Sequence, residues 1–353
     1  MSRLRKARII TLLILLSFVV LSSASVSVAE FYSLKIYPVL SYVFSLFASV
    51  FPFSLDEWVV LFMIVALIAM PFIWRLKCHR RWSSVFLGEM EMILWIYVWF
   101  YMGWGINYYR EDFFTRLKTR PAEYDEKLFK DFLFQYTDSV NKYYHEIESV
   151  SYDSVHKEIK SLYGRLSSSY GFTAPLSFQY PKKLSFNSLY SGSGVLGFMG
   201  PFFAESHINN EMPPLEYPFT YAHELSHLLG VSNEAEANFW AYQICTSSDD
   251  VKIKYSGYFG LFSYVLVNAR GLLSEDDYKN WLDRIRPEVK KQFNEKRIYW
   301  SSLYSPTLGK IQSAMYEMYL KGNRISSGQK NYAQVVGLLL SVPEEGIVFS
   351  SEN

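Results

Sequence analysis

The sequence predicts an α+β protein that is mostly helical, with three N-terminal transmembrane helices followed by one water-exposed domain that holds a small β-sheet. Half of the 353 residues are apolar. The mean hydropathy of +0.02 is too high for an ordinary soluble protein and too low for a transporter. The long uncharged runs lie in the first third of the chain, and helical spacing of apolar residues dominates the remainder.

Three apolar segments are long enough to cross a bilayer as helices. They cover about residues 9–28, 57–75 and 85–106. We therefore assign residues 1–106 to a membrane region. Residues 107–353 remain for a single domain of ordinary size.

Two basic clusters predict the orientation of these helices. Four Lys and Arg residues precede the first helix, and a second cluster lies at residues 75–81. Because positively charged loops stay in the cytoplasm, both clusters predict that the first and third helices run outward and the second runs inward. The domain after residue 107 is then expected outside the cytoplasm, on a multi-pass protein of the cell membrane. A cleaved signal peptide ending near Ala29 is the alternative for the first helix, and the length of its apolar run favours an uncleaved anchor.

Charge is sparse and balanced along the chain. The segment from Phe31 to Ser54 carries one charge, on Lys35, and is expected to lie along the outer membrane surface as an amphipathic segment. Cys78 and Cys245 are expected on opposite sides of the membrane, which excludes a disulfide between them. With a formal net charge of +1 and no basic stripe in its second half, the chain has no electrostatic basis for binding nucleic acid.

Apolar spacing divides the domain into helical and β regions. Three- and four-residue spacing predicts helices over residues 123–149 and 154–168. Short alternating stretches rich in Ser, Gly and aromatic residues predict a small β region over residues 175–207. From residue 218 onward the pattern is mainly helical again.

The segment Tyr221 to Gly230 reads YAHELSHLLG and holds the most informative residues. On a helix, His223 and His227 project from the same face and lie close enough to bind one metal ion. Glu224 lies beside them and can reach a water molecule on that metal. The alternative is two surface histidines on an ordinary helix.

A third ligand is expected just downstream, because catalytic zinc binds three protein side chains and keeps a fourth position for water. Glu234 opens a second predicted helix, and Asn238 lies one turn later, where it can orient a ligating histidine. Glu236 stays open as the alternative ligand. Acidic residues in a first turn also interact favourably with the helix dipole, so one of the two carboxylates is expected to serve only that purpose. The expected metal is Zn²⁺.

A predicted edge strand over residues 197–209 offers a candidate substrate cleft. Glu205, His207 and Asn209 lie along it and are expected to face the substrate. A role in a turn or at the surface is the alternative for His207.

The chain also resembles a bacterial membrane-protein family catalogued as domain of unknown function 3810. The resemblance covers nearly the whole chain, and its motifs lie at Gly103–Arg110, Pro218–Tyr242, Tyr319–Lys321 and Asn331-Tyr332. It implies a zincin-like fold of gluzincin type with an HExxH helix. It also implies specific roles: His223, His227 and Glu234 as zinc ligands and Glu224 as the catalytic carboxylate. Ser226 departs from the small apolar residue usual in the family, but it faces away from the metal.

The expected function is that of a membrane-anchored zinc metallohydrolase, a metallopeptidase that cleaves peptide or protein substrates outside the cytoplasm. A metal-activated water would attack the amide bond, with Glu224 as general base. Two alternatives stay open. One is a non-catalytic scaffold protein with a structural metal site, closed by Glu236 or His207. The other is a zinc amidase that acts on cell-wall peptides.

Overall fold

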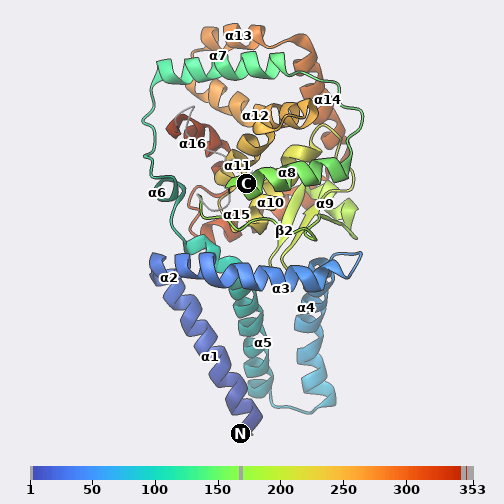
Figure 1. Cartoon of the computed structure of the whole chain (residues 1–353). Helices are drawn as coiled ribbons and strands as arrows, with labels where there is room; N and C mark the ends of the chain where they lie inside the picture. Colours follow the sequence, from blue (N-terminus) through green and yellow to red (C-terminus); the bar gives the residue numbers. More distant parts are fainter. Residues whose placement is uncertain (1–2, 167–169, 343–346, 348–353) are drawn as a thin grey trace. The chain divides into compact units, whose positions relative to one another are not determined.

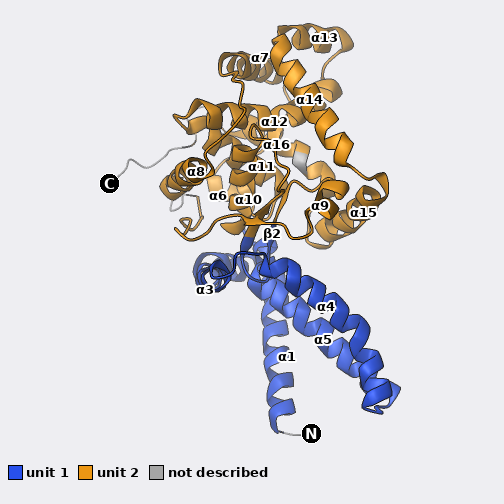
Figure 2. Ribbon diagram, turned by 90° about the vertical axis from the view of Figure 1, so that its right-hand side faces the viewer, with its two compact units in different colours: residues 1–111, 199–205 blue, residues 112–198, 206–353 orange. Residues whose placement is uncertain are grey.

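The computed structural model describes residues 3–166, 170–342 and 347 of the chain. The chain divides into two compact units (Figure 2). The first unit comprises residues 1–111 and 199–205, and the second comprises residues 112–198 and 206–353. The division falls five residues after the boundary expected from the sequence. The short segment 199–205 also joins the first unit, although it is far away in the chain.

Between residues 3 and 111, the regular elements of the first unit are all helices. In chain order these are α1 (Arg3–Ala24), α2 (Val26–Phe31), η1 (Tyr32–Ile36), α3 (Tyr37–Ser49), α4 (Leu55–Phe72), η2 (Ile73–Lys77), α5 (Trp82–Gly103) and η3 (Gly105–Tyr109).

Four segments among the described residues are long and apolar enough to cross a membrane, whereas the sequence predicted three. The additional segment is Val26–Ser49, and the other three are Arg3–Ala24, Leu55–Lys77 and Trp82–Gly103. The prediction of three was wrong because α2, η1 and α3 follow one another without a break. They form one apolar helical segment of 24 residues, which meets the length requirement for a span.

Helix α3 has an apolar exposed face and a small, polar buried face. Val39, Val43 and Leu46 are exposed, whereas Ser41 and Ser45 on the opposite side are buried. Within the first unit, Figure 1 shows α3 running crosswise to α1, α4 and α5. An outward apolar face of this kind matches a lipid environment better than water.

Ion pairs connect separate segments of the first unit. Arg8 Nε lies 2.6 Å from Glu91 Oε1, which joins the first half of α1 to the first half of α5. Beyond the ends of these helices, Arg110 Nη2 lies 2.8 Å from Glu30 Oε1. Helices α1 and α5 therefore run in the same direction.

The segment 199–205 is held in the first unit by the start of α4. Asp56 Oδ1 accepts a hydrogen bond from Phe202 N at 2.9 Å, and its Oδ2 accepts one from Phe203 N at 3.2 Å. Trp99 Nε1 donates to Phe202 O at 3.1 Å, and Ser45 Oγ donates to Ala204 O at 2.8 Å. Four backbone groups at the tip of the β2–β3 hairpin are thus bonded by side chains of the first unit.

The second unit contains most of the chain's helices and the small sheet. Its elements are α6 (Phe113–Leu117), α7 (Glu126–Lys142), α8 (Tyr152–Leu166), β1 (Lys182–Lys183), α9 (Asn187–Ser193), β2 (Gly197–Gly200), β3 (Glu205–Ile208), α10 (Tyr217–Leu228), α11 (Glu234–Ser247), α12 (Val251–Leu272), α13 (Glu275–Arg284), α14 (Pro287–Leu303), α15 (Pro306–Gly322), η4 (Gly328–Gln334) and α16 (Val335–Ser341). The last residues of β2 and the first residue of β3 belong to the first unit.

The mixed, mostly helical class is confirmed, and the sheet is small. In the described residues it has three strands in the order β1-β3-β2, and β1 runs parallel to β3 with Lys182 opposite His207. Helices α7 and α8 correspond to the two helices expected over residues 123–149 and 154–168. The expected β region also contains the helix α9, which ends at Gly194 in the left-handed conformation.

Helices α10, α11 and α12 form the centre of the second unit. All residues of α10 are buried, as are most residues of α11, so that neither helix shows a pronounced apolar face. Trp240 and Phe239 of α11 are fully buried, and Phe113 of α6 packs edge-on against Phe239 at 4.8 Å between ring centroids. The most informative sequence segments therefore lie in the core.

Candidate metal centre

Helix α10 carries the His-Glu-x-x-His sequence inside the second unit. It begins after Glu216, with Pro218 in its first turn. Gly230 follows it with φ of +98°, the left-handed conformation that ends many helices. Tyr163 Oη donates to Ala222 O at 2.8 Å and fixes the middle of the helix. Because every residue of α10 is buried, the alternative of two surface histidines is wrong.

The two histidines present their Nε2 atoms to each other and use their Nδ1 atoms for hydrogen bonds. The Nε2 atoms of His223 and His227 lie 3.1 Å apart. His223 Nδ1 lies 2.9 Å from Asn238 Oδ1, and His227 Nδ1 lies 2.7 Å from Val231 O. Both partners are acceptors, so each Nδ1 carries a proton and each Nε2 is the ring nitrogen that remains for a metal ion.

Glu234 completes a buried group that could hold a metal ion. Its Oε2 lies 3.2 Å from Nε2 of His223 and 3.2 Å from Nε2 of His227. One ligand atom of each of the three residues lies within 4.8 Å of the others. Glu234 comes from the first turn of α11, which follows α10 after a short turn. The tight connection between the two helices therefore brings the carboxylate to the histidine pair.

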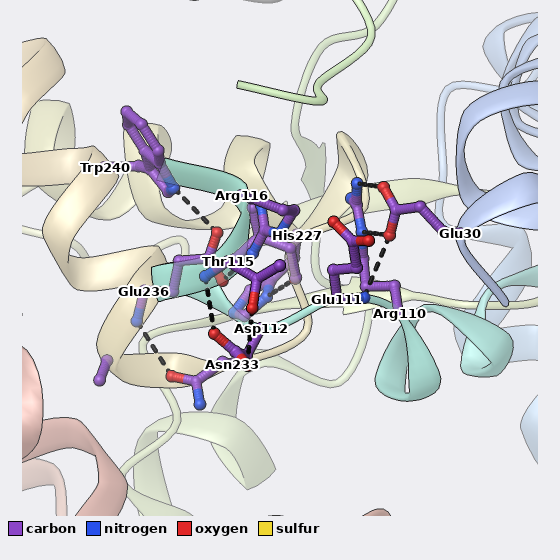
Figure 3. A network of polar contacts seen from close by, with 12 residues as sticks. Glu30, Arg110, Glu111, Asp112, Thr115, Arg116, His227, Asn233, Glu236 and Trp240 are labelled. Carbon is purple, nitrogen blue, oxygen red and sulfur yellow. Dashed lines mark hydrogen bonds and ion pairs between the residues drawn. The ribbon is translucent and has the colours of Figure 1, made fainter. Parts of the chain in front are cut away.

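Glu236 lies in the same turn but has different partners. Its Oε2 lies 2.5 Å from Arg116 Nη2 of α6, and its Oε1 accepts a hydrogen bond from Trp240 Nε1 at 3.0 Å. Figure 3 shows this network, together with the Asn233 side chain that caps the turn by accepting from Glu236 N. Of the two carboxylates that the sequence left open, Glu234 is the one beside the histidines.

Burial and charge act in opposite directions on these groups. Burial acts to raise the pKa of Glu234, but the charge of His227 and hydrogen bonds from both histidines outweigh it, so that this pKa lies well below its usual value. For His227, burial lowers the pKa, but the charge and hydrogen bond of Glu234, the charge of Glu224 and the hydrogen bond to Val231 together outweigh burial and raise the pKa to about 9. Without metal, the site therefore holds a carboxylate beside a protonated imidazole, and a metal ion would replace that proton.

Glu224 has a buried carboxylate oxygen without a partner. No described residue donates a hydrogen bond to its Oε2. Burial raises the pKa of Glu224 to about 7, and the charges of His223 and His227 oppose this rise. Such an atom needs a polar partner, because a buried unpaired carboxylate is costly. A metal-bound water next to the His-His-Glu group would supply it, so the residues present fit a metal ion.

Strand β2 comes close to this carboxylate at Gly197. A Cβ atom at Gly197 would lie 2.7 Å from Glu224 Oε1 and 2.7 Å from His207 O. Only glycine lets the strand approach Glu224 this closely.

The three candidate cleft residues are all buried, and each has a partner within the protein. Glu205 Oε2 accepts a hydrogen bond from Asp56 N at 2.9 Å in the first unit. His207 Nδ1 donates to Phe198 O at 3.2 Å, and the two rings stack at 4.2 Å. Asn209 Nδ2 donates to Val195 O at 3.0 Å. These contacts shape the hairpin, and a direct role in substrate binding stays a prediction.

Several residues around the centre were missed by the sequence analysis. Tyr316 Oη donates to Glu234 Oε1 from a position 82 residues later in the chain. Asn331 Oδ1 accepts from Ala235 N at 3.0 Å, and Tyr264 interacts with Asn238. No local pattern distinguishes Tyr316 from the other members of a set of 28 tyrosines. Asn331 stood out only as part of the family resemblance.

Residues 32–340 of the chain match the family model described as "Protein of unknown function (DUF3810)". No curated protein and no solved structure matches the chain. The family match covers the crosswise helix α3, the metal centre and the C-terminal helices, which is most of the chain. The chain therefore belongs to the DUF3810 family.

Proposed function

We propose that this protein is a membrane-anchored zinc-dependent hydrolase, a gluzincin-like peptidase that cleaves peptide bonds outside the cytoplasm. One observation carries the proposal: a buried His223, His227 and Glu234 group lies beside Glu224, whose buried Oε2 has no hydrogen-bond partner among the described residues. A site that only binds a structural metal has no need for such a carboxylate.

Two imidazoles and one carboxylate are a donor set that suits zinc and leaves a fourth position open. When bound, zinc supplies a Lewis acid that polarises a substrate carbonyl and makes a coordinated water more acidic. His223, His227 and Glu234 would hold it. Asn238 and Val231 keep the two imidazoles in the tautomer that ligates through Nε2.

Glu224 performs the proton transfers in this proposal. Its Oε2 takes a proton from the attacking water and later delivers it to the leaving amine. Burial favours this role, because it raises the pKa of Glu224 to about 7 and brings it close to neutral pH.

The sheet suggests how a substrate is held. In the described sheet, β2 is an edge strand, with β3 as its neighbour. Gly197 of β2 packs against the Glu224 carboxylate. An extended peptide that pairs with the free edge of β2 would therefore pass directly beside Glu224. This favours a peptide over a compact small molecule as the substrate.

The two residues that could close a structural site have other partners. The Glu236 carboxylate is bound by Arg116 and Trp240, and the His207 ring is stacked on Phe198. This supports an open, catalytic position over the scaffold alternative. An amidase for cell-wall peptides would use the same residues and differs only in its substrate.

The arrangement of the first unit supports an extracytoplasmic location for the catalytic unit. The Arg8–Glu91 ion pair joins the basic N-terminus to the first half of α5, and α5 directly follows the basic residues 75–81. Both clusters favour the cytoplasm. Helix α3 runs crosswise to α1, α4 and α5 (Figure 1), as a segment in the membrane surface would. On this proposal α5 leads outward, and the second unit follows it outside.

The metal content of the purified, detergent-solubilised full chain tests the proposal. We expect about one zinc per chain in the wild type and in Glu224→Ala, and none in the double variant His223→Ala/His227→Ala. Peptide hydrolysis should be lost in Glu224→Ala, which keeps its metal. If the wild type binds no zinc at neutral pH, or if Glu224→Ala alone abolishes binding, the hydrolase proposal is wrong.

A further inference from the structure

The two carboxylate oxygens of Glu234 have different partners. Oε2 lies 3.2 Å from Nε2 of His223 and 3.2 Å from Nε2 of His227. Oε1 accepts a hydrogen bond from the hydroxyl of Tyr316. Glu234 is buried, with 5% of its surface exposed, so bulk water does not take the place of this hydroxyl. One oxygen is therefore directed at the candidate metal position, while a phenol holds the other.

Tyr316 comes from α15, and hydrogen bonds to η4 fix this helix. Ser313 Oγ donates to Gln329 Oε1 at 3.1 Å, and Gln329 Nε2 donates back to Ser313 O at 2.8 Å. Gln329 N donates to Glu317 Oε2 at 2.8 Å, directly after Tyr316 in the chain. These contacts hold α15 against η4 at residues on both sides of Tyr316.

The segment formed by α15 and η4 also contacts the backbone of the helical turn that carries Glu234. Asn331 Oδ1, in η4, accepts a hydrogen bond from Ala235 N at 3.0 Å. The segment α15–η4 therefore contacts the first turn of α11 twice, once at a backbone N–H and once at the Glu234 carboxylate. The Glu236 side chain of this turn is held separately by Arg116.

From these contacts we infer that Tyr316 is a positioning residue, which keeps Glu234 a one-oxygen ligand of the metal. A carboxylate binds a metal ion through one oxygen or through both. A strong hydrogen bond from a phenol competes for Oε1, because donation to an ionised carboxylate is stronger than donation to a neutral acceptor. With Oε1 occupied, the fourth position on the metal stays open for water.

This inference rests on the proposed function. It assigns a role in metal binding to Tyr316, which contacts none of the reacting atoms. Its consequence is specific: removing only the hydroxyl should free Oε1, raise the number of atoms bound to the metal and weaken the defined geometry. The ring itself would remain, with its stacking on Tyr319 at 5.9 Å between ring centroids.

The test compares Tyr316→Phe with Tyr319→Phe in the detergent-solubilised full chain. Tyr319→Phe is the matched control, because it removes a hydroxyl from the same helix three residues later. For Tyr316→Phe we expect zinc affinity, measured by chelator competition, to fall about 10- to 100-fold. The visible absorption of the Co²⁺-substituted protein should weaken as the coordination number rises. Tyr319→Phe should match the wild type in both measurements.

Two outcomes would overturn the inference. One is a Tyr316→Phe variant with wild-type zinc affinity and an unchanged Co²⁺ spectrum. The other needs no variant: X-ray absorption of the zinc-loaded wild type that shows both oxygens of the glutamate bound to the metal. Thermal unfolding of the metal-free variants separates loss of fold from loss of positioning. A wild type that takes up no zinc or cobalt would refute the proposed function itself, whereas a metal-loaded wild type indistinguishable from Tyr316→Phe would refute only the role of Tyr316.

Discussion

Asn238 Oδ1 lies 2.9 Å from His223 Nδ1, one helical turn after Glu234 on the same helix. This contact joins α11 to α10 through an atom of His223 that would not bind the metal. It holds the imidazole ring in one orientation and one tautomer. Several properties of the centre should depend on such indirect contacts.

Loss of the Asn238 side chain should weaken metal binding. We expect Asn238→Ala to reduce zinc affinity about 10- to 100-fold, because His223 loses the acceptor that orients it. Asn238→Asp keeps an acceptor oxygen and should stay close to the wild type. Competition with a chromophoric chelator measures both. Equal affinities for Asn238→Ala and the wild type would contradict this role.

A methyl group at Gly197 should disturb the catalytic carboxylate. In Gly197→Ala the new Cβ would lie 2.7 Å from both Glu224 Oε1 and the backbone oxygen of His207. We expect a loss of about 1–3 kcal/mol in the free energy of unfolding, with a reduced rate of peptide hydrolysis. Gly271→Ala in α12 is the control, because nothing lies within 4 Å of its Cβ position. Similar rates and stabilities for both variants would refute the close approach.

Stability should fall when the pH drops below the usual pKa of histidine, because His156 is buried. Burial, followed by the charge of Lys160, lowers the pKa of His156 from 6.5 to about 4. Between these values the unfolded chain binds more protons than the folded one. The contribution of His156 to stability is therefore complete above pH 6.5 and is lost as the pH falls toward 4. This difference between the pKa of His156 in the unfolded and in the folded chain corresponds to at most about 3 kcal/mol in the free energy of unfolding.

Urea unfolding of the solubilised protein at pH 7.5 and at pH 5 measures this dependence. His156→Gln can still hydrogen-bond Tyr217, whose hydroxyl lies 2.7 Å from His156 Nε2, and it has no titrating group. The difference in stability between the two pH values should be smaller in this variant than in the wild type. An unchanged difference would assign the pH dependence to other groups.

Removing Arg116 should destabilise the fold around the centre. Arg116→Met leaves the buried carboxylate of Glu236 without its cation, and breaking such a pair costs about 3–5 kcal/mol. The double variant Arg116→Met/Glu236→Gln should recover part of this loss, since no buried charge remains. Arg284→Met is the control, because it removes an exposed ion pair in which Arg284 lies 3.5 Å from Asp138. This variant should have little effect on stability. Thermal unfolding distinguishes the variants, and equal losses for Arg116→Met and Arg284→Met would refute the expectation.

The two sides of the membrane can be distinguished by thiol labelling. Cys78 is exposed in the basic stretch between α4 and α5, whereas Cys245 is buried. We expect a membrane-impermeant thiol reagent to label Cys78 only after the cells are permeabilised. A cysteine in place of the exposed Lys279 of the second unit should react in intact cells. The opposite pattern would place the second unit in the cytoplasm.

The membrane region shows where sequence reasoning reaches its limit. The apolar runs that became α1, α4 and α5 were identified, because length and hydropathy are properties of the chain alone. Residues 31–54 were expected to lie along the membrane surface, and the overlapping segment 26–49 proved apolar and long enough to be a fourth candidate span. Its crosswise course in Figure 1 depends on the helices beside it, which no local pattern encodes.

By itself, the sequence determined the positions of His223, Glu224 and His227, since a four-residue spacing on a helix places two side chains on one face whatever surrounds it. The tertiary structure alone decided between Glu234 and Glu236. Both carboxylates lie in one turn with similar local surroundings, and the choice depends on what approaches them from elsewhere. Arg116 of α6 binds one, while the histidines of α10 and Tyr316 of α15 bind the other. The contacts of Arg116 and Tyr316 join residues 120 and 82 positions apart in the chain, and a buried charge takes its orientation from whichever partners the fold brings to it.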